Sequence, residues 1–364
     1  MSPENLTPHT KAKLPNRETP LSRRYLNVLQ QWVPLGVRYF QDWPIRPNCG
    51  HFFGGCSWYG SETASTALTL AMVASSPEFD PKLCGASKKT LQEMALKGIR
   101  YLCFTHDTGP ADCVRPEKGL GRPENCGTKW GERGKGFFWE SQCGRYVAKI
   151  AIAALLLGDR VDDETWSMIA NIHADYADRF ADMAPKSGIY TNTQMEENAW
   201  TSAGLASVEC LLPTHTQAQT WAESARRWMY LTVTTPQDTK NLAPAHSGQT
   251  VRQHVGETFT ALPDYWTENH GMIHPTYTAS CLEFLHMIGV IYSIHGKTVP
   301  EQALFNRQQI YDHLKIVADR NGYLHPIQGM DWPYLFADPG TQLHSAAALI
   351  LKDPDAARIE RRAL

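Results

Sequence analysis

Residues 263–277 gather an unusual number of ionisable and aromatic side chains into one short stretch. These side chains are Trp266, Glu268, Asn269, His270, His274 and Tyr277. A carboxyl, two imidazoles and a phenol placed together can hold charge and move protons, which is the work of general acid–base catalysis. An indole face beside them suits the apolar face of a sugar ring. The stretch therefore predicts a carbohydrate-processing site at the start of the apolar segment that follows it.

The elements that must position this stretch are predicted to be helices. Apolar residues recur at helical spacing in segment after segment, whereas strand-like alternation is scarce. Helices are predicted at residues 21–41, 61–77, 87–105, 139–158, 162–182, 197–212, 215–233, 274–295, 300–319 and 341–352. No sequence repeat of solenoid length accompanies them. The pattern favours an all-α fold, an (α/α)n toroid of helical hairpins without a separate β-domain, built as one domain over residues 21–364 after a flexible arm over 1–20.

Composition limits the classes of partner. The formal charge of −2 on 364 residues and the lack of a basic run argue against nucleic acid. The sequence shows neither a secretory leader nor an apolar run that spans a bilayer, so we expect a soluble protein with no membrane partner. The default location is cytoplasmic, or secreted or periplasmic if a leader was removed. Nothing in the sequence predicts an oligomeric state.

Cysteine and histidine spacing does not predict a metal or cofactor. The nine cysteines form no C-x-x-C pair, and a disulfide between loop cysteines such as Cys113 and Cys126 is one option among several. His106, Asp107 and Asp112 stand close together in the sequence, but they do not complete a ligand set. We therefore expect neither a metal nor a cofactor.

The step Asn269-His270-Gly271 resembles the catalytic pair of the α/α-toroid polysaccharide lyases, namely the alginate lyases and the heparinase II/III-like group. In those families a catalytic tyrosine follows farther along the chain, and Tyr323 stands at the matching interval. Residues 138–142 and 196–204 also resemble helical parts of heparinase-like proteins. The resemblance is patchy, and members of these families usually continue into a β-rich domain.

The resemblance implies cleavage of a 4-linked uronate by β-elimination, with a uronate-containing oligo- or polysaccharide as the substrate. Asn269 would neutralise the sugar carboxylate and stabilise the enolate-like intermediate. His270 would be base or neutraliser, and Tyr323 would carry the proton, with Tyr277 and Tyr334 as rivals. His274 lies one helical turn after His270, although Pro275 disfavours helical geometry just before it.

Further residues are predicted to bind the substrate. They stand in Gly-rich loops, at the start of a helix or in aromatic segments, where they could form the wall of a sugar cleft. They are Glu197, Asn198, Trp200, Trp266, Glu268, His274, Trp139, His51, Trp58 and Trp332.

Two other functions fit the same residues. A toroid glycoside hydrolase, of the uronyl hydrolase type, would use two carboxyl groups in place of Asn, His and Tyr. Its candidate carboxyl groups are Glu140, Glu197, Asp264, Glu268 and Asp331. A non-catalytic sugar-binding helical module would account for the aromatic residues, but it seldom needs so many ionisable groups in one loop.

Overall fold

A computed structural model describes residues 12–13, 18–58, 61–120, 123–188, 192–329, 331–332 and 338–364. Helices make up most of this part of the chain, and its only strands are two hairpins of very short strands. The predicted all-α class, with no β-domain among these residues, is confirmed. Most of the predicted arm over 1–20 lies outside the described residues.

The chain divides into two compact units, each of which draws on several segments. Unit 1 comprises residues 1–179, 207–221 and 294–296, and unit 2 comprises residues 180–206, 222–293 and 297–364. The single domain over 21–364 and its ring arrangement stay predictions beside this division.

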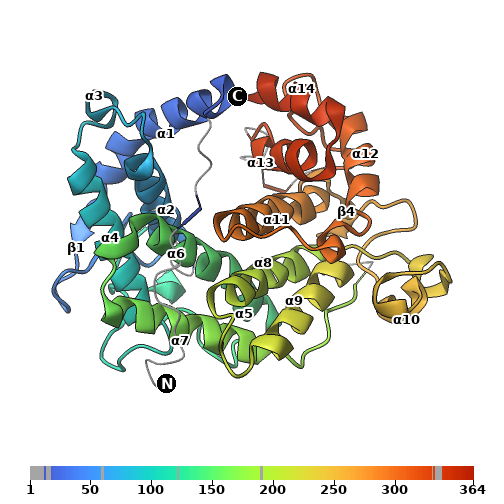
Figure 1. Cartoon of the computed structure of the whole chain (residues 1–364), viewed down its shortest axis with the longest axis horizontal. Helices are drawn as coiled ribbons and strands as arrows, with labels where there is room; N and C mark the ends of the chain where they lie inside the picture. The colour runs from blue at the N-terminus through green and yellow to red at the C-terminus, as the bar shows by residue number, and fades with distance from the viewer. Residues whose placement is uncertain are drawn as a thin grey trace. The chain divides into compact units, whose positions relative to one another are not determined.

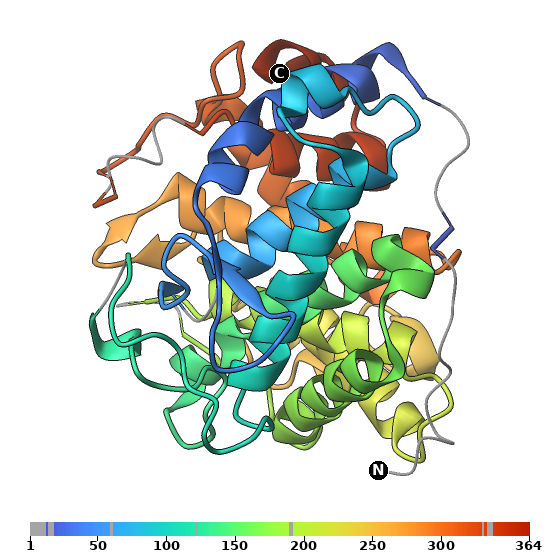
Figure 2. The ribbon, with the colours of Figure 1, turned by 90° about the vertical axis from the view of Figure 1, so that its left-hand side faces the viewer.

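Unit 1 is built around one small-residue helix. Its helices are α1 (Pro20–Arg38), α2 (Ser61–Ser75), α3 (Pro81–Cys84), α4 (Lys88–Thr105), α5 (Phe137–Gln142), α6 (Gly144–Leu157) and nearly all of α7 (Asp163–Phe180). The helix α2 buries Ala64, Ala67, Leu70 and Ala71. It lies against both α4 and α6 (Figure 1), and α4 also runs alongside it in Figure 2. Small side chains on α2 allow this close approach, which forms the core of the unit.

A disulfide fixes the loops of unit 1 beside the hairpin of β1 (Phe40–Asp42) and β2 (Gly50–Phe52). Cys56 is bonded to Cys126, whereas Cys113 is a free, buried thiol. The pairing of Cys113 with Cys126 that the sequence allowed is therefore wrong. Near the bond two backbones touch: a Cβ on Gly119 would lie 2.6 Å from the carbonyl oxygen of Gly54. Both positions thus require glycine.

Unit 2 contains the remaining α-helices, which are the first part of α8 (Met195–Leu211), most of α9 (Ala218–Leu231), α10 (Val251–Val255), nearly all of α11 (Pro275–Ile294), α12 (Arg307–Val317), α13 (Thr341–Ala346) and α14 (Pro354–Ala363). A short hairpin of β3 (Glu268–Asn269) and β4 (Met272–Ile273) precedes α11. Tyr230 and Leu231 at the end of α9 pack against Val251 and Val255 of α10. The sequence pattern missed α10 and α14, because each is too short to show several apolar turns.

The helix α11 has the length and apolar composition of a segment that could cross a membrane. Within the fold, 61% of the relevant window is buried, as in the core helix of a globular protein. The structure therefore uses this apolar segment to line unit 2 and to support the hairpin in front of it.

Candidate active site

The predicted Asn269-His270-Gly271 step forms the turn of the β3–β4 hairpin. Asn269 pairs with Met272, which leaves His270 and Gly271 as a two-residue connection. Both have positive φ angles, 53° for His270 and 82° for Gly271. Such a pair of left-handed residues is the signature of a type I′ turn, whose twist matches that of the flanking strands. The turn leaves the His270 side chain exposed at its tip.

Glu268 and Asn269 hold this turn in place. The two carboxylate oxygens of Glu268 accept from the backbone N–H groups of Gly271, at 2.5 Å, and Asn192, at 2.9 Å. The Asn269 side-chain oxygen accepts from the N–H of His270 at 3.0 Å, and that of Asn192 accepts from the same N–H at 3.1 Å. Both predicted residues are buried. Their polar atoms position the His270 backbone.

The helix α11 supplies the second histidine. His274 lies directly before Pro275, the first residue of α11, so it does not share a helical face with His270. Its backbone N–H donates to the Thr267 carbonyl at 3.2 Å, and the hydroxyls of Thr267 and Thr278 bond each other at 2.7 Å. These contacts tie the hairpin to the first turn of α11 and bury the His274 ring completely.

Asp331 brings the two histidines together. His270 donates through Nδ1 to one carboxylate oxygen, and His274 donates through Nε2 to the other at 3.2 Å. The ring of Tyr277 meets both imidazoles edge-on, with centroids 5.3 Å from His270 and 4.6 Å from His274. The Trp332 indole N–H donates to the Tyr277 hydroxyl at 3.0 Å. The predicted His270, His274, Tyr277 and Trp332 therefore form one cluster, centred on Asp331.

Electrostatics favours an ionised Asp331. Burial raises the pKa of this carboxyl, but the hydrogen bond and the charge of His270, together with the bond from His274, outweigh burial and hold the pKa below its ordinary value. Burial lowers the pKa of His274, and the contact with Asp331 opposes that shift only in part. His274 Nδ1 is buried and has no hydrogen-bond partner among the described residues.

Glu197 carries the opposite shift. It lies in the first turn of α8 and is only 7% exposed. Burial raises its pKa to about 7, and a backbone hydrogen bond and the charge of His270 oppose this only weakly. Within the described part of the chain, its Oε2 atom is buried without a partner. With this pKa, the carboxyl group keeps its proton in about half of the molecules at pH 7 and can donate it.

The neighbours of Glu197 on α8 have structural contacts. Asn198 clamps Lys186, donating to its carbonyl at 2.8 Å and accepting from its N–H at 3.1 Å. Trp200 is 2% exposed and packs against Phe284 of α11. The predicted sugar-binding role of these two residues remains a prediction.

Tyr323 and Trp266 also lie in unit 2 but make other contacts. Tyr323 follows α12 in a turn, where its N–H donates to Asp319 at 3.1 Å. Among the described residues, its side chain forms no hydrogen bond with the His270 cluster. Trp266 meets His313 edge-on at 5.7 Å. Tyr334, the other predicted proton carrier, lies outside the described residues.

The remaining predicted residues belong to unit 1. The rings of Trp58 and Trp139 lie 5.8 Å apart, which places these two indoles together. His51 is buried beside Tyr101, and burial lowers its pKa to about 4. Hence His51 is neutral at physiological pH, in keeping with a core position.

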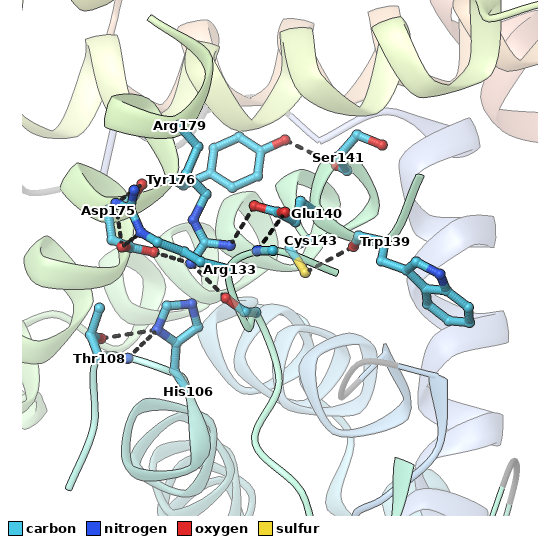
Figure 3. A network of polar contacts seen from close by, with 12 residues as sticks. His106, Thr108, Arg133, Trp139, Glu140, Ser141, Cys143, Asp175, Tyr176 and Arg179 are labelled. Atoms are coloured by element: carbon cyan, nitrogen blue, oxygen red, sulfur yellow. Dashed lines mark hydrogen bonds and ion pairs between the residues drawn. The ribbon is translucent and has the colours of Figure 1, made fainter. Parts of the chain in front are cut away.

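The hydrolase candidate Glu140 is held in an ion-pair network, shown in Figure 3. Arg179 lies between Glu140, at 3.3 Å, and Asp175, which also binds Arg133 at 2.7 Å. The second oxygen of Glu140 accepts from the N–H of Gly134 at 2.9 Å. Both carboxylate oxygens are therefore occupied within unit 1.

The sequence placed Asp331 only among the five candidate carboxyl groups of a hydrolase, although the cluster depends on it. Its separation of 61 residues from His270 hides the contact from any local pattern. The local signal for it was its place directly before Trp332, a predicted substrate-binding residue. Among the described residues, no group of three or more His, Cys, Asp or Glu side chains has an arrangement that could hold a metal ion.

No protein-family model and no curated protein matches this sequence. Two solved structures show a distant likeness. One is a point variant of a glycosidase, with 14% identity and a TM-score of 0.45 over 95% of this chain and 84% of its own. The other is a family 76 glycoside hydrolase from a bovine Bacteroides thetaiotaomicron strain, with 11% identity and a TM-score of 0.44 over 94% of this chain and 68% of its own. At these values neither structure assigns an activity to this chain, whose all-α class rests on its own helices.

Proposed function

We propose that this chain is a glycoside hydrolase that uses Glu197 as general acid and Asp331 as the ionised partner. One observation carries the proposal. Two carboxyl groups of unit 2 have pKa values shifted in opposite directions, with that of Glu197 raised to about 7 and that of Asp331 lowered, and His270 interacts with both. Pairs of carboxyl groups whose environments separate their pKa values in this way divide the acid and base roles of glycoside hydrolysis.

The reaction balances with these groups. Glu197 donates its proton to the glycosidic oxygen as the bond to the anomeric carbon breaks. Water adds to that carbon, and its proton passes to Asp331, whose carboxylate is oriented by His270 and His274. Trp332, with 39% of its surface exposed, offers an indole face for the sugar ring.

This proposal differs from the β-elimination that the sequence resemblance implied. The polar atoms of Glu268 and Asn269 bond backbone groups of the hairpin, and the Asn269 amide oxygen is occupied by the N–H of His270. These contacts support a positioning role for the pair. A uronate-containing oligosaccharide remains the substrate that the sequence predicts.

The test is incubation of the purified full chain with neutral and uronate-containing oligosaccharides, following new reducing ends and ultraviolet absorbance together. We expect new reducing ends without an unsaturated product. The Glu197→Gln variant should lose about 10²- to 10⁴-fold in kcat, the usual contribution of a general acid. The wild-type rate should fall as pH rises through about 7, the pKa of Glu197.

Glu257→Gln is the matched control, because Glu257 is an exposed glutamate in the same unit. Its kcat should equal that of the wild type. An absorbance rise that His270→Ala abolishes would replace the hydrolase with the lyase. Sugar binding without either product would instead indicate a binding module.

A further inference from the structure

A cavity of about 170 Å³ lies within unit 1, between the long loop that follows α4 and the helices α5 and α6. The proposed hydrolysis makes no use of it. Its lining includes Arg115, Asn125, Lys129, Trp130, Trp139 and Cys143. Its volume far exceeds the space that one water molecule needs.

Arg115 is a buried cation that lies against neutral acceptors. It is only 3% exposed. Its Nε donates to the Thr128 carbonyl at 3.1 Å, and its Nη2 donates to the Thr128 hydroxyl at 2.6 Å and to the Lys129 carbonyl at 3.2 Å. Its Nη1 has no partner among the described residues. Tyr101, Glu62, Cys143 and Glu132 act on this guanidinium through space, but none of them bonds it within the described chain. A buried charge without a bonded counter-charge is costly.

Asn125 lines the same cavity and has a second unsatisfied donor. It is 5% exposed, and its side-chain Nδ2 is buried without a partner in the described part of the chain. Thr128 joins it to Arg115, because the Thr128 hydroxyl that accepts from Arg115 also donates to the Asn125 carbonyl at 2.9 Å. Thr128 thus links the Arg115 side chain to the Asn125 backbone, and each of the two side chains keeps a spare N–H group.

Hydrogen bonds fix the walls around these donors. Lys129 Nζ donates to the carbonyls of His106 and Gly109, each at 2.9 Å. The Trp130 indole N–H donates to the Leu102 carbonyl at 2.8 Å. At the other wall, Cys143 contacts the Trp139 carbonyl, as drawn in Figure 3. The lining also contains two carboxyl groups, those of Glu124 and Glu132. Glu132 pairs with Lys135 at 3.3 Å.

We propose that this cavity binds a small oxyanion, a carboxylate or phosphate group on a compact ligand. Arg115 supplies the charge through Nη1, and Asn125 supplies a second N–H. The indole of Trp139 lines the same space and would cover the apolar body of the ligand. The inference stands on unit 1 alone and does not depend on the proposed hydrolysis.

The test is calorimetric titration of the full chain with sodium phosphate, sodium sulfate and sodium glucuronate, at an ionic strength held constant with chloride. We expect saturable binding of at least one of these anions. Saturation by glucuronate alone would assign the site to a carboxylate, whereas saturation by phosphate or sulfate would assign it to a tetrahedral oxyanion. No saturation by any of the three would overturn the proposal.

Two variants locate the binding. Arg115→Met should weaken it at least tenfold, whereas Lys118→Met, an exposed cation in the same loop, should leave it unchanged. Because Arg115 is buried and its variant could fail to fold, Asn125→Asp provides an independent test. A carboxylate at this position supplies the missing counter-charge, so it should raise the thermal midpoint and weaken oxyanion binding at least tenfold. A lowered midpoint with wild-type affinity would overturn the proposal.

Discussion

Glu197 is a carboxyl group that the fold removes from water, and one of its oxygens has no partner within the described chain. Burial therefore destabilises the charged form of Glu197. Native Glu197 holds a proton with a pKa of about 7 against an ordinary value of 4.5. The unfolded chain therefore releases this proton at a lower pH than the native chain does. Between those two pH values the native state binds more protons, so the free energy of unfolding falls as pH rises.

Glu197→Gln should remove this pH dependence. The shift corresponds to roughly 3 kcal/mol of stability lost between pH 4.5 and 7. Burial also raises the pKa of Glu62 to about 7, and Glu62 contributes equally to the pH dependence of the wild type and the variant. Buried histidines such as His51, whose pKa is lowered to about 4, act in the opposite direction, so the wild type and the variant are compared at each pH. In urea unfolding, the difference between their free energies of unfolding should change by roughly 3 kcal/mol over this window. A difference that does not change with pH would mean that Glu197 has the same pKa in the native and the unfolded chain.

At the scale of an element, the β3–β4 hairpin combines a turn requirement with a chemical one. Its first turn residue must adopt a left-handed backbone, which Asn and Gly adopt most readily and β-branched residues resist. The same residue must carry the imidazole that bonds Asp331. His270 meets both needs at the cost of a less favoured backbone conformation.

Two variants separate these needs. His270→Asn should keep the free energy of unfolding within about 1 kcal/mol, because Asn suits the turn, while kcat falls at least about 100-fold. His270→Val should lose activity equally and also destabilise the chain by about 1–3 kcal/mol, since its side chain resists a positive φ. Urea denaturation and a reducing-end assay measure both effects. Equal stability of the two variants would contradict the turn assignment.

The helices were largely predictable, because their apolar residues repeat at a period that the sequence displays. The predicted helix over 87–105 corresponds to α4 (Lys88–Thr105), and that over 274–295 to α11 (Pro275–Ile294). A helix over 139–158 was predicted as one element, but the structure breaks it at Cys143 into α5 and α6. Strands of two or three residues are too short to show alternation.

The contacts of the candidate site were predictable only between residues that are neighbours in sequence. His270 and Tyr277 share one stretch and meet in the structure, whereas Asp331 reaches them from a distant loop. The raised pKa of Glu197 arises from burial, which depends on the packing of unit 2. The local sequence pattern shows neither the contact of His270 with Asp331 nor the burial of Glu197.

At the scale of the whole molecule, the Cys56–Cys126 bond joins positions separated by 70 residues of sequence. Closing a loop of this length restricts the unfolded chain, which stabilises the folded state by about 4 kcal/mol in the chain-entropy account. The Cys56→Ser/Cys126→Ser variant should lose stability of this order, and dithiothreitol should lower the thermal midpoint of the wild type. The midpoint of the double variant should not respond to dithiothreitol. If it falls equally, the reductant acts elsewhere.

The other seven cysteines are buried and take no part in a disulfide. Burial raises the pKa of Cys49 and Cys281 to about 11 and that of Cys143 to about 12. Because only a thiolate attacks an alkylating reagent, these groups are inert in the native state and become reactive as the chain opens. The reaction of these thiols therefore reports on unfolding. The number of alkyl groups gained in a brief pulse of iodoacetamide, counted by mass spectrometry, would measure how much of the chain is open without any added label.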